Sequence, residues 1–289
     1  MEVIRAAVLG YCMGVRRAVD AAAKALAEKR GTGCKVYTLG PLIHNPSVLA
    51  KLAAEGLSVL SEQTLDRADS QSVVLIRAHG TSPAVMERLR QAGCEVVDAT
   101  CPRVHLSQKR AQEWSEKGYE IIIAGDKNHG EVLSISGFAA APVQVVQNAE
   151  EARNLVPAEK SVLIAQTTFS PSVFAEISGI LLKKNSSLLV YNSICSATLE
   201  RQEALQALHG RVDGIVVVGG KNSANTKRLY ETAQHLFDSE RGRAVLIEDE
   251  TQLPSDFCAL KAVGITAGAS TPEEVIAAVE KRLLNAQNA

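Results

Sequence analysis

The stretch VVDATCPRVHLSQKR, residues 96–110, contains the pattern that decides the fold. An apolar run ends at Cys101, and a segment with helical periodicity follows at once. Two other stretches share this arrangement, with Cys12 after the apolar residues 4–10 and Cys195 after residues 188–194. The intervals are nearly even, 89 residues from 12 to 101 and 94 residues from 101 to 195. Such spacing predicts three similar units, each with a cysteine between a strand and a helix.

The rest of each unit repeats as well. A second apolar strand ends at a glycine turn and a polar cluster, in residues 36–45, 121–131 and 215–225. A third strand ends at a polar turn, followed by Ser-Pro or Thr-Pro, in residues 73–83, 161–171 and 262–272. Ser or Thr before Pro is a physically favoured helix start, because the hydroxyl caps the helix and Pro fits its first turn.

This alternation of strands and helices predicts an α/β fold with mainly parallel sheets. We expect three similar α/β domains arranged as a pseudo-threefold trefoil around one central cavity. Ligands in open α/β sheets bind beyond the carboxyl ends of the strands, where all the polar turns fall. One continuous doubly wound sheet is the alternative. The expected domains are residues 1–97 with Cys12, His44 and His79, residues 98–190 with Cys101, His129, Glu131 and Thr167, and residues 191–289 with Cys195, Ser223, Asn225 and Ser270.

Composition limits the class of protein. The 289 residues are 46% hydrophobic but only 4% aromatic, so the core must be aliphatic. A formal net charge of −1 gives no basic field for nucleic acid. We find neither a signal-peptide layout nor an apolar run long enough for membrane insertion, and we expect a cytoplasmic protein. In that compartment, cysteines are more often thiols or metal ligands than disulfides.

Cys12, Cys101 and Cys195 are the candidate metal ligands. A buried cysteine is usually structural, but here three share one setting, and a helix N-terminus favours the thiolate that ligation requires. Cys34, Cys94 and Cys258 lack this setting and are assigned to structure. Three thiolates would leave one position of a zinc ion or an iron–sulfur cluster without a thiolate, and that position could take substrate. A cubane with an open iron fits better than zinc, but the pattern leaves both possible.

Histidines at three of the strand-end turns suggest an anion site. They are His44, His79 and His129, and together with Ser223, Asn225 and Ser270 they could bind phosphate oxygens. No Walker-type loop is present, so a small phosphorylated substrate is expected rather than a nucleotide. Glu131 is the carboxylate of this ring and a candidate proton donor, although an acid in a first helical turn can simply favour the helix dipole. Thr167 and Thr168 offer hydroxyls for relay or orientation, or for capping.

With these motifs in place, the chain resembles the LytB-type 4-hydroxy-3-methylbut-2-enyl diphosphate reductases over nearly its whole length. The matching stretches are residues 10–15, 40–45, 78–80, 98–102, 129–132, 166–168, 194–198, 201–202, 220–223 and 266–270.

The resemblance implies a trefoil around one [4Fe–4S] cluster per chain, held by Cys12, Cys101 and Cys195. It implies reductive removal of the substrate's allylic hydroxyl, giving isopentenyl and dimethylallyl diphosphate in the last step of the non-mevalonate isoprenoid pathway. Two electrons would pass one at a time from ferredoxin or flavodoxin. Glu131 would supply protons near Thr167 and His129. The diphosphate would lie among His44, His79, His129, Thr167, Ser223, Ala224, Asn225 and Ser270.

Four positions depart from the family pattern. Gly130 stands where proline is usual, Ala224 where serine is common, Asn192 for an aspartate and Ser134 for a glycine. We therefore expect the loop with Glu131 to be less restricted than is usual in the family. Ala224 lacks a side-chain hydroxyl that could bind the phosphate. Two alternative functions are also consistent with the sequence. One is an iron–sulfur hydro-lyase, which needs no electrons, and the other is a non-catalytic binding module whose site is closed by zinc.

Overall fold

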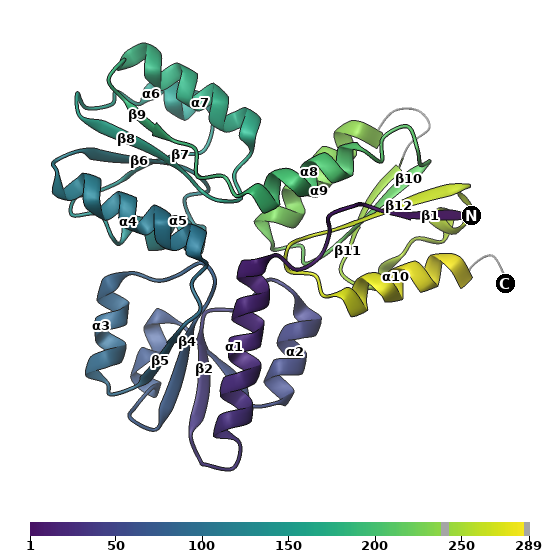
Figure 1. Ribbon diagram of the computed structural model, residues 1–289, viewed down its shortest axis with the longest axis horizontal. Coiled ribbons are helices and arrows are strands. Elements are labelled where there is room, and N and C mark those ends of the chain that lie inside the picture. The colour runs from purple at the N-terminus through teal and green to yellow at the C-terminus, as the bar shows by residue number, and fades with distance from the viewer. Residues whose placement is uncertain (238–242, 286–289) are drawn as a thin grey trace. The chain divides into compact units, whose positions relative to one another are not determined.

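The computed structural model of the protein describes residues 1–237 and 243–285 (Figure 1). The chain forms two compact units, one from residues 1–16, 43–51 and 196 onward, the other from residues 17–42 and 52–195. We describe each unit by itself. The last residues of the expected third domain, 286–289, lie outside the described residues.

The second unit holds two parallel four-stranded sheets. The first has the order β3-β2-β4-β5 and is built from β2 (Lys35–Leu39), β3 (Leu57–Leu60), β4 (Ser72–Ile76) and β5 (Glu95–Asp98). The second has the order β7-β6-β8-β9 and is built from β6 (Glu120–Ala124), β7 (Gln144–Val146), β8 (Ser161–Ala165) and β9 (Leu189–Tyr191).

Helices cover both faces of these sheets (Figure 1). Those associated with the first sheet are α1 (Met13–Lys29), α2 (Pro46–Ala54), α3 (Pro83–Gln91) and the 3₁₀ helix η1 (Glu62–Arg67). Those flanking the second are α4 (Pro102–Glu116), α5 (Gly130–Ser136), α6 (Ala149–Asn154) and α7 (Pro171–Lys184).

The other unit holds one parallel sheet, with the order β1-β12-β10-β11. Its strands are β1 (Glu2–Arg5), β10 (Gly214–Val218), β11 (Arg243–Ile247) and β12 (Ala262–Ala267). Its helices are α8 (Ser196–Gln206), α9 (Ala224–Phe237), α10 (Glu273–Asn285), and the 3₁₀ helices η2 (Glu250–Gln252) and η3 (Ser255–Ala259).

All three sheets have the same strand order. If the strands of each are numbered along its repeat, the order is second, first, third and fourth, with β5, β9 and β1 as the fourth strands. Three parallel sheets in an α/β chain confirm the predicted fold class, and the separate sheets exclude one continuous sheet among the described residues.

The strand before each cysteine differs from the expected plan. The sequence pattern made it the first strand of the unit that the cysteine begins, but it pairs at the edge of the preceding sheet. β1, the strand before Cys12, pairs instead with β12 late in the chain, with Glu2 beside Ala262 and Arg5 beside Ile265. The expected domain boundaries, 97/98 and 190/191, fall inside β5 and β9, and they stay a prediction.

The core is aliphatic, as the composition predicts. Successive residues of β10 face opposite sides of the sheet because strand side chains alternate. Val216 and Val218 pack in one cluster with residues of α10, including Ile276. Ile215 and Val217 pack in another, with residues of α8 and α9. Burial on both faces is typical of central parallel strands.

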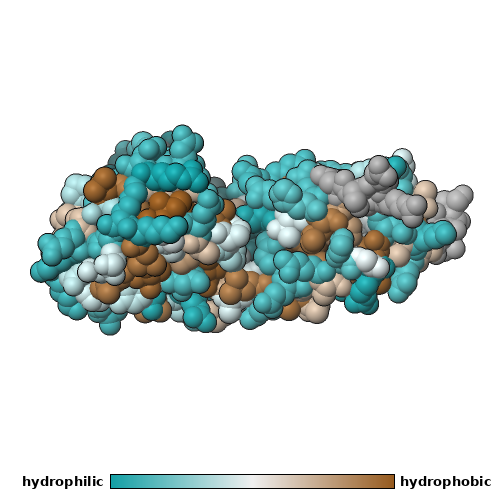
Figure 2. Space-filling view, turned by 90° about the horizontal axis from the view of Figure 1, so that it is seen from above, coloured by the Kyte–Doolittle hydropathy of each residue, from teal (hydrophilic) through white to brown (hydrophobic). Residues whose placement is uncertain are grey.

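Polar residues cover much of the face in Figure 2, and apolar residues appear there in scattered patches. Across the described part of the chain, no helix combines the length and apolar character required to cross a membrane.

Candidate functional site

Cys12, Cys101 and Cys195 occupy equivalent positions in the three repeats. Each lies between the fourth strand of a sheet and the next helix. The main-chain N–H of each donates to a carbonyl two residues beyond the third strand of that sheet. These bonds run from Cys101 to Ala78 at 3.0 Å, from Cys195 to Thr167 at 2.8 Å, and from Cys12 to Ala269 at 3.1 Å. The same backbone contact therefore holds all three cysteines beside a strand-end turn.

The chemistry of these three residues fits thiolate ligation. None of the three forms a disulfide, all are partly exposed, and each immediately precedes a helix. Cys12 belongs to one unit, and Cys101 and Cys195 belong to the other. Among residues 1–237 and 243–285, no group of three His, Cys, Asp or Glu side chains lies close enough to hold a metal ion. The meeting of the three sulfurs at one centre stays a prediction.

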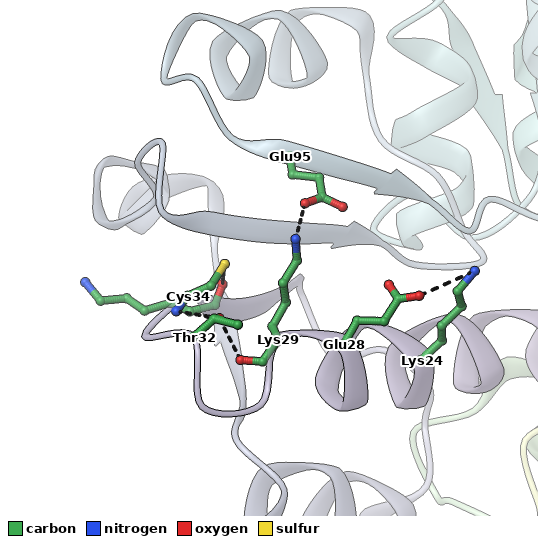
Figure 3. Close-up of polar contacts among 7 residues, drawn as sticks. Lys24, Glu28, Lys29, Thr32, Cys34 and Glu95 are labelled. Carbon is green, nitrogen blue, oxygen red and sulfur yellow. Dashed lines mark hydrogen bonds and ion pairs between the residues drawn. The ribbon is translucent and has the colours of Figure 1, made fainter.

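The other cysteines have different surroundings. Cys34 lies in the turn after α1, where its N–H donates to Thr32 and where Lys29 pairs with Glu95 at 2.6 Å (Figure 3). Cys94 packs against the core of the first sheet, and burial, together with the charge of Asp69, raises the pKa of its thiol. Cys258 lies within η3. None of the three occupies the junction that the candidate ligands share.

Glu131 is the buried acid of the candidate site, with 1% of its surface exposed. It lies in the first turn of α5, where His129 is the N-cap and its Nδ1 accepts from the N–H of Glu131 at 3.2 Å. Both carboxylate oxygens are engaged by Thr167: Oε1 accepts from the main-chain N–H at 2.6 Å, and Oε2 accepts from the hydroxyl at 2.7 Å. One residue thus fixes the plane of the carboxylate.

The remaining predicted residues of this unit adjoin Glu131. The rings of His79 and His129 lie 4.8 Å apart, centre to centre. His79 follows Ala78, the residue that accepts from Cys101, and Thr167 is the residue that accepts from Cys195. The structure therefore brings together one connected set, comprising Cys101, His79, His129, Glu131, Thr167 and Cys195.

Gln166 is a residue to which the sequence pattern assigned no role. It is fully buried, its Oε1 accepts from the N–H of Asp126 at 2.8 Å, and its Nε2 donates to Thr168 at 2.8 Å. Gln166 thereby ties the turn with Thr167 to the loop that leads to His129. Its place at the end of a buried strand, before two threonines, was the available sequence signal.

The other unit gathers a second set of predicted residues. The hydroxyl of Ser270 donates to the carbonyl of His44 at 3.2 Å. The same carbonyl lies so close to Gly220 that a Cβ there would collide with it. Ser223 precedes α9, and its hydroxyl accepts from the N–H of Thr226 at 3.4 Å. The loop of His44 therefore packs on the turns that follow β10 and β12.

Asn225 supplies an unused donor in this set. It lies in the first turn of α9, just after Ala224, and is 5% exposed. Among the described residues, no group accepts a hydrogen bond from its side-chain Nδ2. A buried amide without an acceptor is costly unless a ligand supplies one, and phosphate oxygens are acceptors only. Asn225 thus fits an anion site next to a helix N-terminus.

Comparison with known proteins gives a consistent family. Curated relatives from Treponema denticola and Geobacter sulfurreducens are each called 4-hydroxy-3-methylbut-2-enyl diphosphate reductase. The first is 47% identical over 98% of this chain and 99% of its own length. The second is 39% identical over 100% of this chain and 99% of its own length.

Two solved structures are also similar over nearly the full chain. One is of (E)-4-hydroxy-3-methyl-but-2-enyl diphosphate reductase, described as the terminal enzyme of the non-mevalonate pathway, with 36% identity and a TM-score of 0.73, covering 99% of this chain and 100% of that one. The other is the reductase from Plasmodium falciparum, with 28% identity and a TM-score of 0.89, covering 98% and 88%. The family described as LytB protein matches residues 3–284, and the chain belongs to that family.

Proposed function

We propose that this chain is an oxidoreductase that removes the allylic hydroxyl of 4-hydroxy-3-methylbut-2-enyl diphosphate. The products are isopentenyl and dimethylallyl diphosphate, and the reaction is the last step of the non-mevalonate isoprenoid pathway. Relatives at 37–47% identity that carry this name span almost the whole chain, and they support the proposal. The reaction balances when each substrate molecule takes up two electrons and two protons and releases one water.

The equivalent setting of Cys12, Cys101 and Cys195 is the observation on which the proposal rests. Their donor chemistry fits an iron–sulfur cluster, and we assign them as ligands of one [4Fe–4S] cluster per chain. When bound, such a cluster passes single electrons and has one position that no protein ligand fills. The one-electron donor is proposed to be ferredoxin or flavodoxin, in the cytoplasm.

Proton delivery is assigned to Glu131. Its carboxyl group is buried, which keeps bulk water from competing for the proton, and both oxygens are oriented by Thr167. The Thr167 hydroxyl can relay a proton because a hydroxyl both donates and accepts. His129 caps the same turn and fixes where the helix with Glu131 begins.

Binding of the diphosphate is assigned to the polar turns of the repeats. The residues assigned to this role are His44, Ser223, Ala224, Asn225 and Ser270 in one unit, and His79, His129 and Thr167 in the other. The free amide of Asn225 and the main-chain N–H groups of the first turn of α9 are suitable donors for phosphate oxygens. Ala224 contributes only its main chain there.

Cysteine substitutions test the proposal. Serine is a poor replacement for a soft thiolate ligand, so Cys12→Ser, Cys101→Ser and Cys195→Ser should each lose most bound iron and sulfide and most reductase activity. The matched controls are Cys34→Ser, Cys94→Ser and Cys258→Ser, which should retain the cluster absorbance. Protein purified without oxygen is assayed for iron, sulfide and turnover. Full iron content and activity in any of the first three variants would disprove the ligand assignment.

A further inference from the structure

A buried hydrogen-bond chain lies next to the candidate site. The side-chain amide of Gln108 donates to the hydroxyl of Ser134 at 2.7 Å, and that hydroxyl donates to the carbonyl of Thr81 at 3.3 Å. Gln108 is 2% exposed and Ser134 is 3% exposed. Hydrogen bonds in such a dry environment are strong, and a broken one leaves a polar group unsatisfied.

These hydrogen bonds attach α5 at a second point, in addition to the bonds between Glu131 and Thr167. Glu131 and Ser134 are three residues apart, so they lie on neighbouring parts of one helical face. Glu131 is held by Thr167 beyond β8, and Ser134 is held to Thr81, two residues after His79. The short helix α5 is therefore tied to the turns of two different sheets.

Gln108 is itself held in place. It lies on α4, two helical turns after Cys101, and its Oε1 is 2.9 Å from Nδ1 of His105. His105 in turn lies 3.3 Å from the carboxylate of Asp98 at the end of β5. The amide orientation is thus set by neighbours and not only by Ser134.

The turn with His79 rests directly on the Gln108–Ser134 pair. Gly80 has a positive φ of 74°, and a Cβ at this position would lie 2.7 Å from the Ser134 hydroxyl and closer still to the Gln108 amide. Only glycine fits there without displacing one of the two side chains. A shift of either side chain would therefore displace the turn that carries His79.

Gly130 makes this restraint on α5 more important. It is the first residue of the helix and has no side chain to restrict its backbone. The space beside it is taken by the guanidinium of Arg77, with which any Cβ at Gly130 would collide. The N-terminal turn that carries Glu131 is therefore held by side-chain bonds, from His129 and Thr167 at its start and from Ser134 further along the helix.

We propose that Gln108 and Ser134 are positioning residues for proton delivery. They hold the Glu131 carboxyl at a fixed position relative to the turn that carries His79. This inference rests on the proposed function. The two products differ in which carbon receives the proton: the carbon that lost the hydroxyl in dimethylallyl diphosphate, and the other end of the allyl system in isopentenyl diphosphate. Displacement of the acid should therefore alter the product ratio as well as the rate.

The test compares Ser134→Ala, Gln108→Met and the double variant as cluster-loaded enzymes, well below their unfolding temperatures. Each should lower kcat by on the order of 10- to 100-fold, the cost of misplacing a reacting group by a fraction of an ångström to an ångström. KM should change less than kcat, because most residues assigned to the diphosphate lie on turns other than the one with His79. The double variant should be no slower than the slower single one, since all three lose the same contact. The ratio of the two products should change in all three.

Gln112→Met is the matched control, because Gln112 lies on the exposed face of the same helix and its side-chain amide donates to Glu116 at 2.9 Å. It should behave as the parent. A kcat within threefold of the parent in both single variants, or an unchanged product ratio, would overturn the positioning role. Glu131→Gln is assayed in parallel: if that variant keeps parental turnover, the proposed acid is wrong, whereas its loss of turnover beside unaffected Gln108 and Ser134 variants refutes only the present inference.

Discussion

At the scale of single residues, Glu131 combines burial with two hydrogen bonds from one neighbour, Thr167. Glu131→Gln keeps the shape and most of this bonding but removes the transferable proton. We expect turnover to fall by roughly 10²-fold or more, the usual scale for a general acid, while cluster content and substrate affinity persist. Anaerobic turnover with a strong reductant measures this. Near-parental turnover would mean that the proton comes from elsewhere.

His44 and Ser270 test the anion site at the same scale. His44→Ala and Ser270→Ala should weaken substrate binding by about tenfold to over a hundredfold, since hydrogen bonds to charged groups contribute about 1.5–3 kcal/mol. Ser270→Ala also removes the bond to the His44 carbonyl, so the two effects should not add fully in the double variant. Calorimetric titration with pyrophosphate reads the affinity. Unchanged binding in both single variants would remove these residues from the diphosphate site.

Residue roles were predictable from sequence only where a residue belongs to a local pattern. Cys101 and Glu131 stand out because each directly follows a strand-end signal and begins a helix. Gln108 and Ser134 carry no such signal, since these two residues lie 26 positions apart in the chain and on different helices. Gln166 is similar, because its partner Asp126 is 40 residues away. Tertiary contacts of this kind follow from packing, which a single sequence does not reveal.

At the scale of elements, β1 is held to its sheet by ladder bonds to β12 and by Arg5. Arg5 bonds to Glu280 through Nε at 3.1 Å and Nη2 at 2.6 Å, and to Glu273 at 2.5 Å. These bonds raise the pKa of Arg5, and the bond to Glu280 contributes more than the bond to Glu273. The forked contact joins the first strand of the chain to α10, its last described helix.

Glu280→Ala should therefore lower the free energy of unfolding by about 1 kcal/mol, the upper range for a partly exposed ion pair with good geometry. The effect should shrink at high salt because the charges are screened. Urea unfolding followed by circular dichroism measures it. Glu274→Ala, at an exposed position on the same helix, is the control, and equal urea midpoints for the two variants would contradict a role for the Arg5 contact.

Element types were readily predicted, but one pairing was not. Aliphatic runs and Ser-Pro or Thr-Pro starts predict strands such as β4 and helices such as α3, and both are present. The partner of β1 could not be inferred from local pattern, because β12 lies about 260 residues later in the chain. Sheet edges are filled by whichever strand tertiary folding brings alongside.

At the scale of the whole molecule, the three sheets share one strand order. In each sheet, candidate site residues follow the first strand and the third strand at the same distance along the chain. Five residues after the first strand of each repeat come His44, His129 and Ser223. Three residues after each third strand come His79, Thr168 and Ser270. Each sheet therefore presents polar side chains at equivalent points beyond its strands, as the threefold sequence repeat predicts.

Reductive loss of the substrate hydroxyl is the central claim, and one measurement tests it most directly. Cluster-loaded protein is incubated without oxygen with 4-hydroxy-3-methylbut-2-enyl diphosphate, with and without a one-electron reductant, and the diphosphate products are separated and quantified. We expect isopentenyl and dimethylallyl diphosphate only when reductant is present, with two electrons consumed per molecule formed. Conversion of the substrate without reductant would instead identify a hydro-lyase, and the absence of both products from fully loaded, reduced protein would contradict the proposed reaction altogether.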